Sequence, residues 1–125
     1  MALVIQKYGG TSVGSVERIR SVARRVARRR EEGDRVVVVV SAMAGETDRL
    51  VGLTSDMAGQ PECREIDVVV SAGEQVSAGL LAIALNDLGC RAKSLLGFQI
   101  PVITEATHTR ARIEKIEGER ITREL

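Results

Sequence analysis

The hydrophobic pattern of the first forty residues predicts a strand, a helix and a second strand. Leu3 to Tyr8 forms a strand-like segment, and apolar residues then recur at spacings of three and four from about Ser15 to Arg30, which is typical of an amphipathic helix. Arg35 to Val40 contains five consecutive valines, which indicates a central strand covered on each side. The order predicts a right-handed crossover unit, and hence an open, mostly parallel α/β sheet with helices on both faces.

The chain after the valine strand contains both helix-like and strand-like segments. Ile66 to Val70 is β-branched enough for a strand, but the spacing of apolar residues from Ile66 to Ala84 favours a helix, with a possible kink at Gly73. A second helix is expected from about Thr47 to Met57. Three short apolar runs then predict strands, and the last residues begin another helix; these segments are 92–96, 100–104, 111–116 and 121–125.

Composition narrows the kinds of partner. The chain has 125 residues, 44% of them hydrophobic, and a formal net charge of +1, which fits one compact domain or part of one. This balance, with one Phe and one Tyr, gives no reason to expect nucleic acid. The N-terminus lacks the basic region and the length of a signal peptide or membrane span, so we expect a cytoplasmic protein with no membrane partner. Cys63 and Cys90 lie far apart, so no cysteine-type metal site is expected.

Candidate chemistry begins where the first strand ends. The run from Lys7 to Ser15 reads K-Y-G-G-T-S-V-G-S and leads into the predicted helix at Ser15, its expected N-cap. Glycines allow backbone N–H groups to approach an anion closely, the helix adds the positive end of its dipole, and a lysine adds a full charge. The sequence therefore predicts a phosphate site in this loop.

A second loop follows the valine strand. Ser41 comes directly after that strand, and Thr47 lies where an N-cap or a ligand hydroxyl contact is expected. Because ligands of open α/β sheets bind beyond the carboxyl ends of the strands, Lys7 and Ser41 should face one crevice. Neither loop has the spacing G-x-x-x-x-G-K-[ST] or G-x-G-x-x-G, so a different nucleotide fold is implied.

Four segments resemble the N-terminal part of bacterial aspartate kinases, in the amino-acid kinase family with its carbamate-kinase-like fold. They are K-Y-G-G-T-S-V-G from Lys7, V-V-V-V-V-S-A-M-A-G-E-T-D from Val36, S-A-G-E-Q-V from Ser71, and a late G-x-Q followed by H-T-R-A-R-I. They span nearly the whole chain in family order. Phe98 departs from the pattern, because relatives often carry Ser, Asn or Trp there.

The resemblance implies transfer of the ATP γ-phosphoryl group to the side-chain carboxylate of L-aspartate, giving 4-phospho-L-aspartate at the head of lysine, threonine and methionine biosynthesis. It implies that Lys7 is catalytic and bridges the transferring group, and that Glu74 pairs with the substrate ammonium. Mg²⁺ is expected to arrive with ATP, without a metal ligand on the chain. The implied phosphate contacts are Lys7, Tyr8, Gly9, Gly10 and Ser12, and the implied aspartate contacts are Ser41, Thr47 and Glu74.

Other interpretations stay open beside this one. In the family, the nucleotide half and the regulatory domains follow the matched region, so the resemblance implies that residues 1–125 are the substrate-side part, with little activity alone. Another amino-acid kinase, for glutamate or acetylglutamate, and a non-catalytic binding or assembly fragment are the alternatives, and a homo-oligomer is left open.

Taken alone, the candidate residues have plainer explanations. Ser41 and Thr47 are more often helix caps than ligands, and Glu74 is more often a solvated carboxylate. His108 is expected at the surface rather than in the chemistry. The arginines between Arg24 and Arg30 are followed at once by acidic residues, which favours a solvated helix face.

Overall fold

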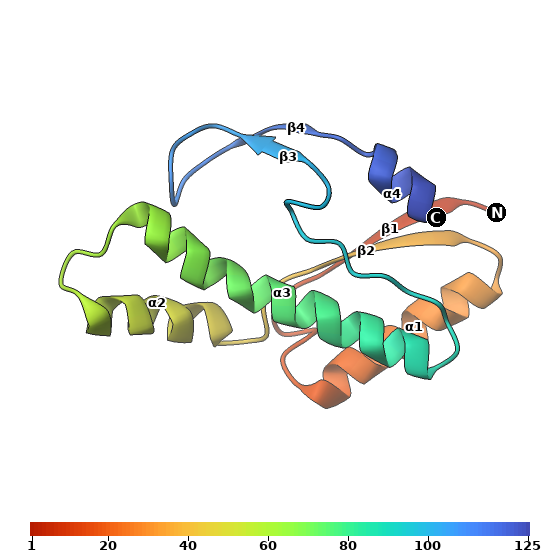
Figure 1. Ribbon diagram of the computed structural model, residues 1–125. Helices are drawn as coiled ribbons and strands as arrows, with labels where there is room; N and C mark the ends of the chain where they lie inside the picture. The colour runs from red at the N-terminus through yellow and green to blue at the C-terminus, as the bar shows by residue number, and fades with distance from the viewer.

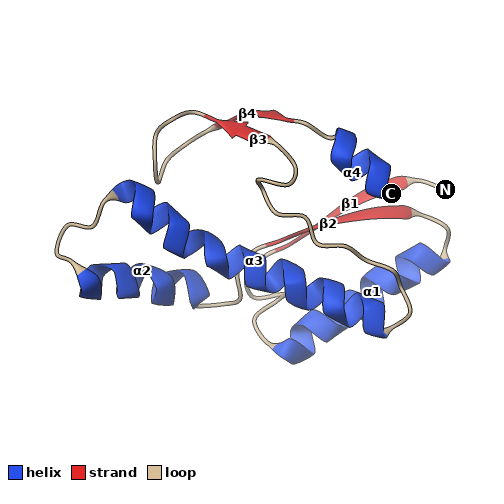
Figure 2. Ribbon diagram, viewed as in Figure 1, coloured by secondary structure: helices blue, strands red, loops and turns tan.

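The computed structural model describes all residues from 1 to 125 and shows a mixed α/β chain with two small sheets (Figures 1 and 2). β1 and β2 pair in parallel, from Leu3 opposite Arg35 to Tyr8 opposite Val40, and β3 and β4 form an antiparallel hairpin. The elements are β1 Leu3–Tyr8, α1 Val16–Glu31, β2 Arg35–Val40, α2 Glu46–Met57, α3 Cys63–Asp87, β3 Val102–Thr104, β4 Ile113–Ile116 and α4 Glu119–Glu124.

α1 supplies half of the residues of the main hydrophobic core. Its N-cap is Ser15, as predicted, whose side chain accepts a hydrogen bond from the Arg18 amide at 3.3 Å. After its last turn the chain reverses at Gly33, which has a φ of +94° that a side chain would disfavour. Four apolar side chains at helical spacing are buried and meet two leucines of α3; they are Ile19, Val22, Ala23 and Val26, with Leu81 and Leu85 as partners.

One face of the β1–β2 sheet is covered and the other is open. Alternate valines of β2, Val36, Val38 and Val40, pack against the core, and both α1 and α3 contact this strand. On the opposite face Ile5 is 68% exposed and Val39 is 49% exposed. The parallel α/β class is confirmed, but the expected cover on both faces is not found, because each helix that contacts β2 belongs to the one core.

α3 is a continuous helix that runs through Gly73, so the apolar spacing correctly favoured helix over strand. A Cβ on Gly73 would lie 2.9 Å from the Ala42 Cβ, closer than carbon atoms approach without a shift. The glycine thus lets α3 lie directly against the loop after β2. By length and composition alone α3 could cross a membrane; here it packs against α1, α2 and β2, with 22% of its most apolar stretch buried.

The last third of the chain forms an arm with little packing. The predicted strand at 92–96 is not formed, because no neighbouring strand pairs with it, and residues 100–104 contribute only the three residues of β3. β4 and α4 occupy the positions expected for a strand and a helix. Neither hairpin strand packs against a helix or strand outside the hairpin, and Figure 1 shows the hairpin standing apart from the core.

Candidate functional site

Lys7 and Ser41 lie at the carboxyl ends of the two paired strands, as the sequence predicts. Lys7 is opposite Val39, and the Ser41 amide donates a hydrogen bond to the Tyr8 carbonyl at 3.1 Å, which extends the pairing beyond β2. Lys7 is exposed, and its ammonium group makes no hydrogen bond or ion pair within the chain. A free cation therefore stands at this edge of the sheet.

The glycine loop offers unpaired backbone donors. The amides of Gly9, Gly10 and Thr11 make no hydrogen bond within the chain, whereas the Ser12 amide closes a turn on the Gly9 carbonyl at 3.0 Å. The N-terminus of α1 follows four residues after Thr11, with the positive end of its dipole at the loop. Three consecutive free N–H groups, a helix N-terminus and a nearby lysine are the donors that an anion such as phosphate requires.

Glycines bring the second loop against the first loop and against α3. A Cβ on Gly10 would lie 3.2 Å from the Ala42 carbonyl oxygen, and one on Gly14 would lie 3.3 Å from the Ala44 Cβ. On the other side, Gly73 meets Ala42 as described. The loop of residues 41–45 therefore lies between the glycine loop and α3, with Ala42 buried, and Glu74 follows directly after the contact on α3.

Thr47 does not cap α2. The helix begins at Glu46, and its N-cap is Gly45, which has a φ of +77° and provides no side-chain cap. The N-cap interpretation of Thr47 was therefore wrong, because the left-handed turn that starts the helix needs a glycine one position before Glu46. Thr47 lies in the exposed first turn with its hydroxyl unbonded.

The other predicted site residues differ in whether their side chains are free to contact a ligand. Ser41 is half-buried, and Glu74 and Ser12 are exposed. None of these three side chains makes a hydrogen bond within the chain; only their backbone groups do. Tyr8 is buried, and its hydroxyl donates to Gln6 Oε1 at 3.0 Å. The Tyr8 side chain is thus committed to a contact inside the chain, which leaves its backbone as the group nearest the loop.

One charged pair beside these loops was missed from the sequence. Arg49 donates two hydrogen bonds to the Glu46 carboxylate, at 2.7 and 2.9 Å, and this pairing holds the pKa of Glu46 below its ordinary value and raises that of Arg49. The Glu46 side chain also borders the packing of α3 at Gly73. The spacing of three residues on a helix was the signal that could have found the pair.

A separate cavity lies away from these loops. Its volume is about 610 Å³, and it opens where α1 and α3 end, with Arg30, Gly89 and Lys93 among its lining residues and none of the predicted site residues. No cluster of three His, Cys, Asp or Glu side chains could hold a metal ion. The candidate site is therefore an open surface formed by two loops and a helix.

The fold and this surface define a mixed α/β protein with a parallel sheet and a glycine loop whose amides are unpaired. The chain belongs to the amino acid kinase family, because the sequence model of that family matches residues 2–125. It is 53% identical over 125 residues to aspartate kinase Ask_LysC of Stutzerimonas stutzeri strain A1501 and 54% identical over 125 residues to an aspartokinase of Pseudomonas aeruginosa. Each match covers 100% of this chain and 30% of the relative.

A solved structure shares the fold. The crystal structure of aspartate kinase from Synechocystis matches with a TM-score of 0.75 and 50% sequence identity, over 78% of this chain and 17% of the other. This likeness confirms the fold class and the resemblance to aspartate kinases. The chain spans about 30% of the length of its curated relatives.

Proposed function

We propose that this chain supplies the substrate-side part of a kinase that transfers the ATP γ-phosphoryl group to the side-chain carboxylate of L-aspartate. The observation that carries the proposal is the group of unpaired amides at Gly9, Gly10 and Thr11 beside the free ammonium of Lys7. Relatives that match the whole chain are named aspartate kinases, which supports aspartate as the acceptor.

The chemistry needs charge compensation more than proton transfer. A carboxylate side chain is already ionised at neutral pH, so this nucleophile requires no general base. The obstacle is the approach of an anion to a polyanion, and phosphoryl transfer is catalysed chiefly by positioning and by neutralising the transferring oxygens. In this proposal Lys7 binds the transferring group and the Gly9 and Gly10 amides hold the adjacent phosphates.

The acceptor is proposed to lie on the other side of the 41–45 loop. Glu74 is exposed and unpaired next to that loop, so its carboxylate is free to bind the ammonium group of the amino acid. The unbonded hydroxyls of Ser41 and Thr47 are available to its carboxylates. These assignments divide the site into a cationic half for ATP and a mixed half for aspartate.

Membership in the family implies the use of ATP with Mg²⁺. Glu74 is the only carboxylate among the proposed contacts, and it is assigned to the ammonium group, so none of these contacts is assigned to the metal. We propose that Mg²⁺ arrives bound to the nucleotide. We also propose a cytoplasmic location, a role in amino-acid biosynthesis, and little turnover by residues 1–125 alone, because the relatives are about three times as long.

Titration of the chain with ATP and Mg²⁺ tests the phosphate site. In Lys7→Met we expect binding at least about tenfold weaker, because a charge-assisted contact is lost. Lys115→Met, on the exposed strand β4, is the matched control and should bind like the parent chain. Equal affinity in Lys7→Met and the parent chain would refute the role of Lys7.

Thermal-shift measurements with L-aspartate, L-glutamate and N-acetyl-L-glutamate test the acceptor. Aspartate should stabilise the parent chain most, and Glu74→Gln should reduce that shift, whereas Glu114→Gln on β4 should not. A larger shift with glutamate or its acetylated form would identify another member of the family. An ADP-release assay showing turnover like that of full-length aspartate kinases would refute the proposed low activity.

A further inference from the structure

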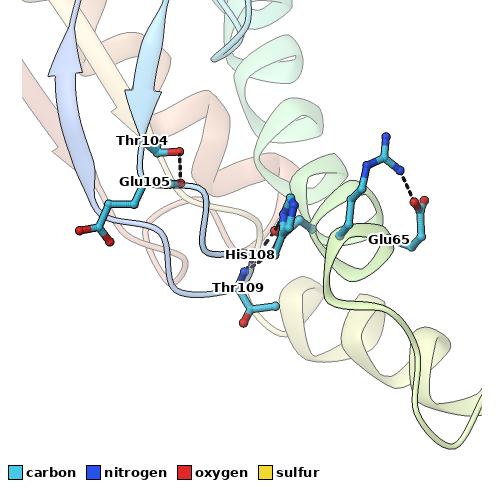
Figure 3. Close-up of polar contacts among 7 residues, drawn as sticks. Glu65, Thr104, Glu105, His108 and Thr109 are labelled. Atoms are coloured by element: carbon cyan, nitrogen blue, oxygen red, sulfur yellow. Dashed lines mark hydrogen bonds and ion pairs between the residues drawn. The ribbon is translucent and has the colours of Figure 1, made fainter.

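The tip of the hairpin is held to α3 at a single carboxylate, Asp67. His108 Nδ1 lies 2.8 Å from Asp67 Oδ2, and the Thr109 amide lies 3.1 Å from each carboxylate oxygen. Figure 3 labels His108 and Thr109 in the loop, beside the helix that they contact. An ionised carboxylate only accepts hydrogen bonds, so the imidazole Nδ1 is the donor. These contacts lower the pKa of the Asp67 carboxyl, chiefly through His108 and then through Thr109.

Thr109 adopts a backbone conformation that a threonine rarely adopts. Its φ is +64°, and it is the only residue other than glycine with a positive φ in the chain. A β-branched residue in the left-handed region is strained, and such strain persists only where surrounding contacts hold it. Here the contact is the Thr109 amide itself, which donates to both oxygens of Asp67. The loop is thus shaped to meet this carboxylate.

Little else attaches the arm to the core. β3 and β4 pack only against each other, and the loop between them, residues 105–112, is closed by a hydrogen bond from the Glu105 amide to the Arg112 carbonyl at 3.0 Å. At its other end the arm is joined through the irregular segment after α3 and an ion pair between Lys93 and Glu124, 2.7 Å long. Release of Asp67 would leave the loop free to move on that segment.

Asp67 lies on the face of α3 that also carries Glu74. Seven residues separate them, which is two helical turns or about 10 Å on the same side of a helix. Ser71, one turn from each, is exposed and small. The docked loop therefore meets α3 two turns before Glu74, on the same face of the helix.

We propose that Asp67 is a latch that docks the 105–112 loop on α3 as a strap beside the substrate face. The Asp67 carboxylate selects the docked state by accepting hydrogen bonds from His108 and Thr109, and the strain at Thr109 favours release when that carboxylate is removed. The assignment of the neighbouring face to aspartate rests on the proposed function; the latch itself does not. Asp67 is thus a positioning residue.

Amide hydrogen exchange of the 125-residue chain, read by NMR, tests the latch. The Thr109 amide should exchange roughly tenfold more slowly than in Asp67→Ala, because the variant removes its charged acceptor. Asp87→Ala, another exposed carboxylate of α3 with no bonded partner, should leave Thr109 exchange unchanged. Amides of the Leu81 turn report whether the core is intact in each variant. Equal Thr109 exchange in the parent chain and Asp67→Ala overturns the proposal.

Thr109→Gly gives an independent test. Glycine keeps the amide donor and accepts a positive φ, so the amide at position 109 should remain protected. Loss of protection equal to that in Asp67→Ala would show that the loop is held by something other than this donor, and would overturn the latch.

Added L-aspartate connects the latch to the site. It should slow Thr109 exchange further in the parent chain and leave it unaffected in Asp67→Ala. Aspartate binding with no change at Thr109 would overturn the strap's placement beside the substrate face. An absence of aspartate binding would refute the proposed function instead, while the comparison with Asp67→Ala would still decide the latch.

Discussion

The β1–α1–β2 unit and the β3–β4 arm are held by different forces. The first unit joins its elements through buried side chains such as Ile19 and Val26, which are 2% and 3% exposed. The arm presents Ile113, 61% exposed, and is tied to the rest of the chain by hydrogen bonds and an ion pair at its two ends. Apolar burial gives the unit most of its stability, whereas the arm depends on a few polar contacts.

This difference assigns the two regions different roles. A region with a buried core opens only when the domain unfolds, but a region with few buried contacts opens locally at lower free energy. The glycine loop and Ser41 belong to the first unit, whereas His108 and Thr109, which contact Asp67 on α3, belong to the region that opens. The distribution of buried apolar surface therefore agrees with the proposed roles, in which the glycine loop holds phosphates in fixed positions and the 105–112 loop moves.

Replacing one isoleucine in each region gives the largest expected contrast. Ile19→Ala should lower the free energy of unfolding by about 2–5 kcal/mol, since it leaves a cavity between α1 and α3. Ile113→Ala removes the same atoms from a mostly exposed site and should cost about 0.5 kcal/mol or less. Urea unfolding followed by circular dichroism measures both. Similar losses in the two variants would show that the arm shares the core.

Two glycines of α3 test the close contact between this helix and the loop after β2. Gly73→Ala should destabilise the chain by about 1–3 kcal/mol, because its Cβ would collide with Ala42. Gly79→Ala meets nothing within 4 Å and should stabilise it by about 0.5–1 kcal/mol through helix propensity. The two changes are chemically identical, so opposite signs in thermal unfolding would isolate the close approach. A stabilising Gly73→Ala would contradict the described packing.

The smallest effect concerns pH at the latch. The pKa of Asp67 is lowered from 3.8 by His108 and Thr109, so its contribution to docking is complete above pH 3.8 and is lost as the pH falls through the lower folded value. Carbon-13 NMR of the Asp67 carboxyl should show this low pKa, and in His108→Ala the pKa should rise toward 3.8. An unchanged titration in His108→Ala would contradict the assigned cause.

Local apolar patterns predicted these elements without information about their partners. α1 and α3 were anticipated from apolar spacing near 3.6 residues, β2 from its unbroken run of valines, and β1 from its short apolar segment. The prediction of a strand at 92–96 was wrong, because a strand requires a neighbouring strand to pair with, and the local pattern carries no information about such a neighbour. Thr47 was misplaced as a cap because a glycine at position 45 controls where α2 begins.

The candidate site was foreseen in part for the same reason. The adjacency of Lys7 and Ser41 follows from parallel pairing, so it could be inferred from two strand ends. The contact of His108 with Asp67 spans 41 residues and carries no local signal, so the sequence left His108 without a partner. The proposed ligand contacts of Glu74 and Thr47 stay predictions, based on the resemblance and on their unbonded side chains.

Gly10, Gly14 and Gly73 surround Ala42 and Ala44 without contributing a side chain. The gap between the two loops is therefore set by bare backbone and methyl groups, which act as spacers for the polar groups around them. A single added carbon at one of these positions would push the loops apart before it reached any ligand. An engineer seeking to reshape this surface for a bulkier acid could thus begin with the spacers and keep every charged group in place.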